Sequence, residues 1–122
     1  MKVLMSIKPQ YVEKIFSGEK KYELRRKIFQ KDVKTIVVYA SNPVMKIIGE
    51  IDIENIISDS PISIFDKYKE DLCINQEDYF RYFYNTNIAY AIKIKNIRKY
   101  SIPKNLDELG LKRAPQSYIY LL

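Results

Sequence analysis

Apolar and polar positions along the chain follow two periods, which predict strands and helices. Alternating or continuous apolar residues predict strands over residues 3–7, 21–26, 35–40, 44–56, 89–97 and 117–121. Apolar residues at helical spacing predict helices over residues 9–17, 61–72 and 77–84, and a helical turn over 103–109. The chain therefore combines several strands with short helices.

Proline, glycine and serine residues mark where several of these elements begin and end. Pro9 lies in the first turn of the first predicted helix, and Gly18 lies where that helix ends. Ser60 is the expected N-cap of the second helix, with Pro61 at its first position. Gly49 predicts a bulge or bend within a long β-branched strand.

The order of elements predicts an α+β fold. The strands are mostly consecutive or separated by short helical insertions, so the chain does not alternate as a doubly wound α/β fold does. We expect a small, mixed, mostly antiparallel β-barrel with short flanking helices. A chain of 122 residues fits a single domain, and residues 1–122 are predicted to form one.

Composition narrows the chemistry that the protein can use. The sequence has no histidine and one cysteine, Cys73, so a histidine triad, a cysteine metal cluster and an intramolecular disulfide are excluded. Catalysis would have to use Lys, Glu, Asp, Tyr, Ser or Thr, and no metal or cofactor is expected. The apolar stretch before Lys8 is too short for a signal peptide, and no run approaches the ~18 apolar residues of a membrane span. These features predict a cytoplasmic protein that does not enter a membrane.

The charge is basic overall and unevenly distributed. The net charge is +6, with +5 over residues 8–34, −6 over residues 50–84 and +5 over residues 85–122. A basic balance favours an anionic partner, most commonly nucleic acid. An alternative is that a Lys-, Ile- and Asn-rich composition reflects an AT-rich genome. A basic patch exists only if the two basic segments share one face.

The segment "SGEKKYELRR", residues 17–26, has two interpretations. As a strand it places Tyr22 and Leu24 on one face and Glu23 and Arg25 on the other. Glu23 and Arg25 would then form a solvated ion pair contributing about 0–1 kcal/mol. Alternatively, Glu23 fixes the guanidinium of Arg25, which binds a phosphate or a base edge with two parallel hydrogen bonds.

Four residues of this segment also carry a family resemblance. Gly18, Lys20, Glu23 and Arg25 fit the pattern Gly-x-Lys-x-x-Glu-x-Arg after an N-terminal strand and helix. With "SIKPQYVEKIFSGEKKYELRR" and the tail "RAPQSYIYL", the sequence resembles stand-alone prokaryotic members of the ASCH domain family. The resemblance implies a PUA-like barrel with a helix-lined cleft and a role linked to RNA.

The resemblance implies two possible activities. One branch of the family deacetylates N4-acetylcytidine with a lysine and a threonine of the motif and a more distant glutamate. Lys20 matches the lysine, but Glu23 occupies the threonine position, which weakens this interpretation. Another branch cleaves single-stranded RNA, again with a motif lysine.

The predicted site combines the motif with other polar residues. Lys8 precedes a helix N-terminus, Tyr39 and Ser41 end a central strand, and residues 112–118 are rich in donors. Each also has an alternative interpretation without a functional role: Lys8 as a surface lysine, Tyr39 and Ser41 as a strand end, and residues 112–118 as a turn. The predicted nucleic-acid-binding residues are Lys8, Lys20, Lys21, Glu23, Arg25, Tyr39, Ser41, Arg113, Gln116, Ser117 and Tyr118.

Three functions remain open at this point. The first is an RNA- or nucleotide-binding domain with a basic cleft, acting in RNA metabolism or gene regulation. The second is an RNA-processing enzyme with Lys20 as base, assisted by Glu23 or Ser117. The third is a protein-interaction module that uses the acidic middle of the chain. The first two require residues 17–27 and 112–118 to meet, and none of the three fixes the oligomeric state.

Overall fold

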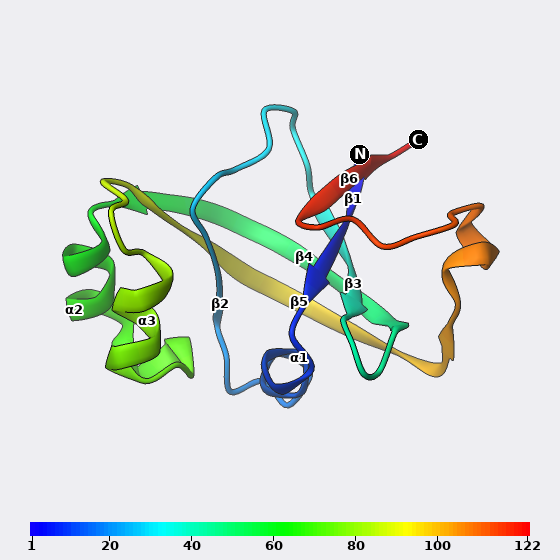
Figure 1. Ribbon diagram of the computed structural model, residues 1–122, viewed down its shortest axis with the longest axis horizontal. Helices are drawn as coiled ribbons and strands as arrows, with labels where there is room; N and C mark the ends of the chain where they lie inside the picture. The colour runs from blue at the N-terminus through cyan, green and yellow to red at the C-terminus, as the bar shows by residue number, and fades with distance from the viewer.

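The computed structural model describes residues 1–122 and contains six strands and three α-helices (Figure 1). The strands are β1 (Lys2–Ile7), β2 (Tyr22–Arg25), β3 (Thr35–Ala40), β4 (Lys46–Asp59), β5 (Ala89–Lys104) and β6 (Tyr118–Leu121). The helices are α1 (Pro9–Phe16), α2 (Pro61–Leu72) and α3 (Gln76–Tyr82), with a 3₁₀ turn η1 (Leu106–Leu109). Every predicted element is present.

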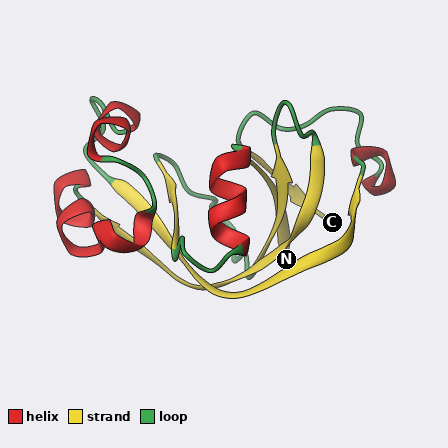
Figure 2. Ribbon diagram, turned by 90° about the horizontal axis from the view of Figure 1, so that it is seen from below, coloured by secondary structure: helices red, strands yellow, loops and turns green.

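The strands form one mixed sheet in the order β2-β5-β4-β3-β1-β6. Only β1 and β3 are parallel, and the other neighbours are antiparallel. The sheet curves into a trough, and α1 lies within it while α2 and α3 cover one end (Figure 2). The α+β class is confirmed, with the barrel present as a half-barrel whose outer strands are β2 and β6.

The core is divided between three apolar clusters. The main cluster joins α1 to the sheet through Val12 and Ile15. A second cluster, around Tyr79, holds α2 and α3 against β2 and β5. The third includes Leu4 and Tyr39 and lies on the opposite face from the main cluster, because successive strand residues point to opposite sides. Helices α2 and α3 are therefore held to the sheet by a different apolar cluster from the one that holds α1.

The largest difference from the predicted elements lies after residue 97. β5 continues to Lys104, so Pro103 belongs to the strand and not to the predicted helical turn, which is limited to η1. Beyond Lys93, β5 has β4 as its only neighbour. A proline is tolerated there because residues 100–103 have no partner in β4: the register passes from Lys99 opposite Gly49 to Lys104 opposite Ile47.

Gly49 lies at the predicted irregularity, and its substitution is expected to be costly. The register of β4 against β5 shifts between Ile47 and Gly49, and a Cβ at Gly49 would lie 2.3 Å from the carbonyl oxygen of Arg98. Because that contact is with backbone, we expect Gly49→Ala to lower the free energy of unfolding by about 3 kcal/mol or more.

Gly18→Ala is the matched control for this prediction. Gly18 has φ +84° but open space around it, so its substitution should cost only about 1–2 kcal/mol of backbone strain. Urea denaturation of both variants measures the difference. Equal losses at the two positions would show that the close approach at Gly49 has no energetic consequence.

Candidate functional site: a cavity around Lys20

A cavity of about 550 Å³ lies between α1, β2, α3 and the segment that precedes β6. Its walls carry four cations, two carboxylates and several neutral polar groups. The lining residues are Ser6, Ile7, Lys8, Gln10, Tyr11, Lys20, Glu23, Leu24, Arg25, Ser41, Ile74, Asp78, Arg81, Tyr82 and Gln116. Six of the eleven residues predicted from the sequence therefore share one cavity: Lys8, Lys20, Glu23, Arg25, Ser41 and Gln116.

Lys20 is the most deeply buried cation of this cavity. Its exposed fraction is 3%, and its Nζ donates a hydrogen bond of 2.6 Å to the carbonyl oxygen of Leu72, the last residue of α2. The amine also lies 5.0 Å from the ring centroid of Tyr11. Burial lowers the pKa of Lys20 below its ordinary value, and the nearby carboxylate of Glu23 partly opposes this shift.

Glu23 pairs with Arg25 and not with Lys20. Its Oε2 atom accepts a hydrogen bond from Nε of Arg25 at 3.0 Å and forms an ion pair with Nη2 at 2.9 Å. The Glu23 and Arg25 side chains are only 7% and 13% exposed. The solvated ion pair considered from the sequence is therefore wrong, because α1, α3 and the segment before β6 enclose this face of β2.

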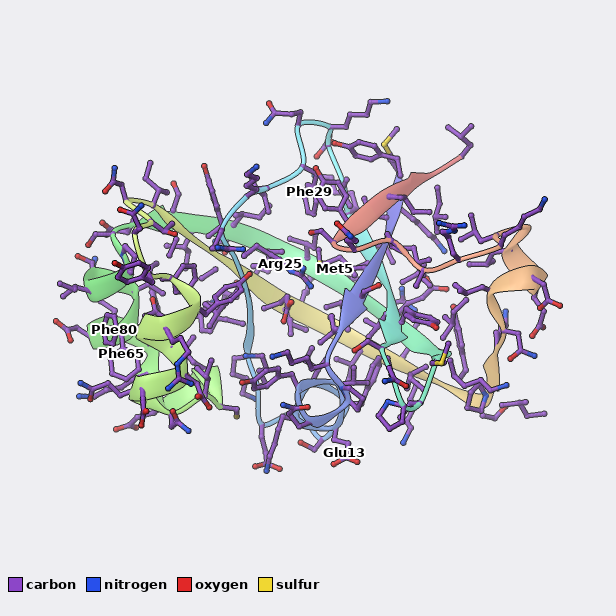
Figure 3. All side chains as sticks on the ribbon, viewed as in Figure 1. Met5, Glu13, Arg25, Phe29, Phe65 and Phe80 are labelled. Atoms are coloured by element: carbon purple, nitrogen blue, oxygen red, sulfur yellow. The ribbon has the colours of Figure 1, made fainter.

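Arg25 also joins the two outer regions of the half-barrel. Its Nη2 donates to the carbonyl oxygen of Ser6 in β1 at 2.9 Å, and its Nη1 lies 3.4 Å from Oγ of Ser117. Figure 3 shows Arg25 between β2 and β1. The Ser6 hydroxyl in turn donates to the carbonyl oxygen of Pro115 at 2.7 Å. The expected meeting of residues 17–27 with 112–118 is confirmed.

These contacts change the expected role of Arg25. In the sequence interpretation, Glu23 fixes the guanidinium of Arg25, which then forms two parallel bonds to a ligand. In the structure, bonds to Glu23, Ser6 and Ser117 use most of its five N–H donors. Arg25 therefore acts mainly as an internal clamp that closes one wall of the cavity.

Five predicted residues do not line the cavity. Lys21 is exposed, because its neighbours Lys20 and Tyr22 are the ones buried at the start of β2. Tyr39 is buried in the third apolar cluster, on the other face of the sheet. Arg113 is exposed in the loop before β6, and Tyr118 packs edge-on against Phe29. Ser117 reaches the site through Arg25 alone.

Helices α1 and α3 supply lining residues that the sequence did not single out. Gln10 and Tyr11 come from the first turn of α1, while Asp78, Arg81 and Tyr82 come from α3. The run of aromatic residues at 79–84 could have pointed to one of these lining residues, Tyr82. Tyr79 and Phe83 are buried, as expected of core residues, while Tyr82, between them on α3, faces the cavity.

The structure contains no group of three or more metal-ligating side chains. None of its helices has the length and apolar character of a membrane span. Cys73 is half-buried. It adopts φ 53° at the C-terminal end of α2, next to the carbonyl that holds Lys20.

Comparison with known proteins places this fold and cavity in a family. The family described as "Domain of unknown function (DUF365)" matches residues 1–111. An ASCH domain-containing ribonuclease of Zymomonas mobilis is 30% identical, over 97% of this chain and 82% of the relative. The crystal structure of ASCH from Zymomonas mobilis superposes with a TM-score of 0.90 and 28% identity, covering 99% of this chain and 87% of that chain.

Two relatives from Ureaplasma parvum are much longer than this chain. ATP synthase subunit alpha is 27% identical and large ribosomal subunit protein uL22 is 28% identical, each over 98% of this chain. The chain spans 15% and 39% of their respective lengths. Taken together with the matches above, the chain belongs to the DUF365 family and to the ASCH domain proteins.

Proposed function

We propose that this domain binds single-stranded RNA by taking one nucleotide into the cavity, and that Lys20 serves there as the base of RNA cleavage. The observation that carries the proposal is a buried amine with a lowered pKa that has no carboxylate partner. Because Lys20 lies inside the cavity, only a nucleotide that has left its base stack can reach it. The substrate is therefore unpaired RNA.

The proposed reaction follows from the state of the Lys20 amine. A neutral amine donates to the Leu72 carbonyl and keeps a lone pair that accepts the proton of a ribose 2′-hydroxyl. The 2′-oxygen then forms a bond to phosphorus while the bond from phosphorus to the 5′-oxygen breaks. A proton from solvent completes the leaving 5′-hydroxyl, and the other product ends in a 2′,3′-cyclic phosphate. Lys8 and Arg81 line the cavity and would stabilise the charge on the phosphate.

The comparisons support this activity over other uses of the cavity. The Zymomonas relative is a ribonuclease, and its crystal structures include one serine-to-alanine and one tyrosine-to-phenylalanine variant. This chain has a serine, Ser117, on the Arg25 clamp and a tyrosine, Tyr11, beside Lys20. Tyr11 lines the cavity and is placed to assist a proton transfer, whereas Ser117 would act through Arg25.

Hydrolysis of N4-acetylcytidine is less well supported. Glu23 stands where the resemblance expects a threonine, and its carboxylate is committed to Arg25. RNA binding itself distinguishes the protein-interaction module from both enzymes, because that hypothesis involves no nucleic acid.

Binding of an unlabelled single-stranded RNA is expected to weaken with salt. Two phosphate contacts, from Lys8 and Arg81, would give a log–log slope of about −1.4, and Lys8→Ala should reduce its magnitude by about 0.7. Calorimetric titration between low and physiological salt measures both values. Lys95→Ala, on an exposed part of β5 outside the cavity, is the control and should leave the slope unchanged. Salt-independent binding would contradict phosphate contact.

A further inference from the structure

We infer that Glu23 is a specificity-determining residue that selects nucleotides whose base carries an exocyclic amino group. This inference rests on the proposed function, since it assigns the part of the nucleotide that meets one wall of the same cavity. It goes beyond RNA binding by naming the chemistry that would be selected: cytosine, adenine or guanine in preference to uracil.

The two carboxylate oxygens of Glu23 have different environments. Oε2 accepts a hydrogen bond from Nε of Arg25 and forms an ion pair with its Nη2, whereas Oε1 accepts no hydrogen bond from any group of the protein. Glu23 is only 5% exposed and lines the cavity. Every fully buried side-chain nitrogen or oxygen of the protein has a hydrogen-bond partner, so Oε1, which has none, keeps some accessible surface. Oε1 is therefore open to the cavity. A carboxylate held in this way presents a fixed acceptor to whatever enters.

The position of this acceptor sets the orientation of a bound nucleotide. A phosphate beside Oε1 would meet like charge in a partly desolvated place, so the phosphate belongs nearer Lys8 and Arg81. The base then faces Glu23. The clamp on Arg25 makes Oε1 rigid, because Arg25 is itself tied to Ser6 and Ser117. A rigid acceptor loses little conformational entropy on binding.

An exocyclic amino group satisfies this acceptor better than uracil does. Carboxylates accept from the N4 amino group of cytosine, which projects beyond the ring. The one base N–H of uracil is recessed between two carbonyl oxygens, which a carboxylate repels. Cytosine and uracil have nearly the same shape, so the comparison between them isolates the hydrogen bond. A site that holds a buried acceptor rejects a ligand without the matching donor, because the acceptor is left unpaired.

The first experiment needs no variant. Dissociation constants of the unmutated protein are measured by calorimetry for 2′-O-methylated oligocytidylate and oligouridylate of the same length, which cannot be cleaved, in the same salt. We expect oligocytidylate to bind at least about tenfold more tightly, as one charge-assisted hydrogen bond allows. Equal binding of the two would overturn the inference while leaving RNA binding intact. Absence of binding to either would overturn the proposed function as well.

Glu23→Gln provides the second experiment. The amide can keep its oxygen on Arg25 and turn its NH₂ group into the cavity, which replaces the acceptor by a donor. The preference should then reverse, and oligouridylate should bind as tightly as oligocytidylate or more tightly. Circular dichroism checks that the variant is folded. A folded variant that retains the full preference for oligocytidylate would contradict base selection by Glu23.

Discussion

Lys20→Met is expected to lower the rate of single-stranded RNA cleavage by about 10²- to 10⁴-fold, the range that a positioned general base contributes. Methionine has a similar length and no amine, so it fills the space of Lys20 without a base. Binding of RNA should change little, since Lys8 and Arg81 remain. The rate is measured with an end-labelled oligonucleotide, together with its dissociation constant. A variant that still cleaves at the unmutated rate would exclude Lys20 as the base.

The pH dependence of cleavage gives an independent test of Lys20. Because burial lowers its pKa below 10.5, the neutral amine should be populated at lower pH than for an exposed lysine. The rate should therefore rise with pH, with its midpoint below 10.5, and fall as acid protonates the amine. Lys69→Met, at an exposed position of α2, is the control and should keep the rate and the profile.

Arg25→Ala is expected to lower the free energy of unfolding by about 3–5 kcal/mol, the cost of leaving one partner of a buried ion pair uncompensated. The substitution removes the charge that balances Glu23 and also the bonds to Ser6 and Ser117. β2 and β1 are not neighbours in the sheet, so this clamp is what links them across the cavity. Equilibrium denaturation in urea measures the loss.

Two companion variants show whether the clamp or the charge alone is responsible. Arg25→Lys keeps the charge but cannot hold Glu23, Ser6 and Ser117 together, so it should recover only part of the loss. Arg81→Ala removes an arginine of α3 that is 67% exposed and paired with Glu77 and Asp78, and should cost only about 0–1 kcal/mol. Similar losses for Arg25→Ala and Arg81→Ala would contradict the clamp.

The elements of the fold were predictable because their signals are local. Pro9, Gly18 and Ser60 mark helix boundaries whatever the rest of the chain does, and each lies at the end expected of it. The extension of β5 through Pro103 was missed, because whether a proline disrupts a strand depends on which neighbours that strand has.

The sequence by itself determined the six strands, the short helices, the absence of histidine chemistry and the importance of the Gly18–Arg25 motif. Only the tertiary structure decided which cation Glu23 holds, since Lys20 and Arg25 are equally plausible partners along the chain. The tertiary structure also decided that Tyr39 lies on the other face of the sheet and that Tyr11 and Tyr82 line the cavity. These outcomes depend on curvature and on helix packing between segments far apart in sequence, and no local pattern encodes them.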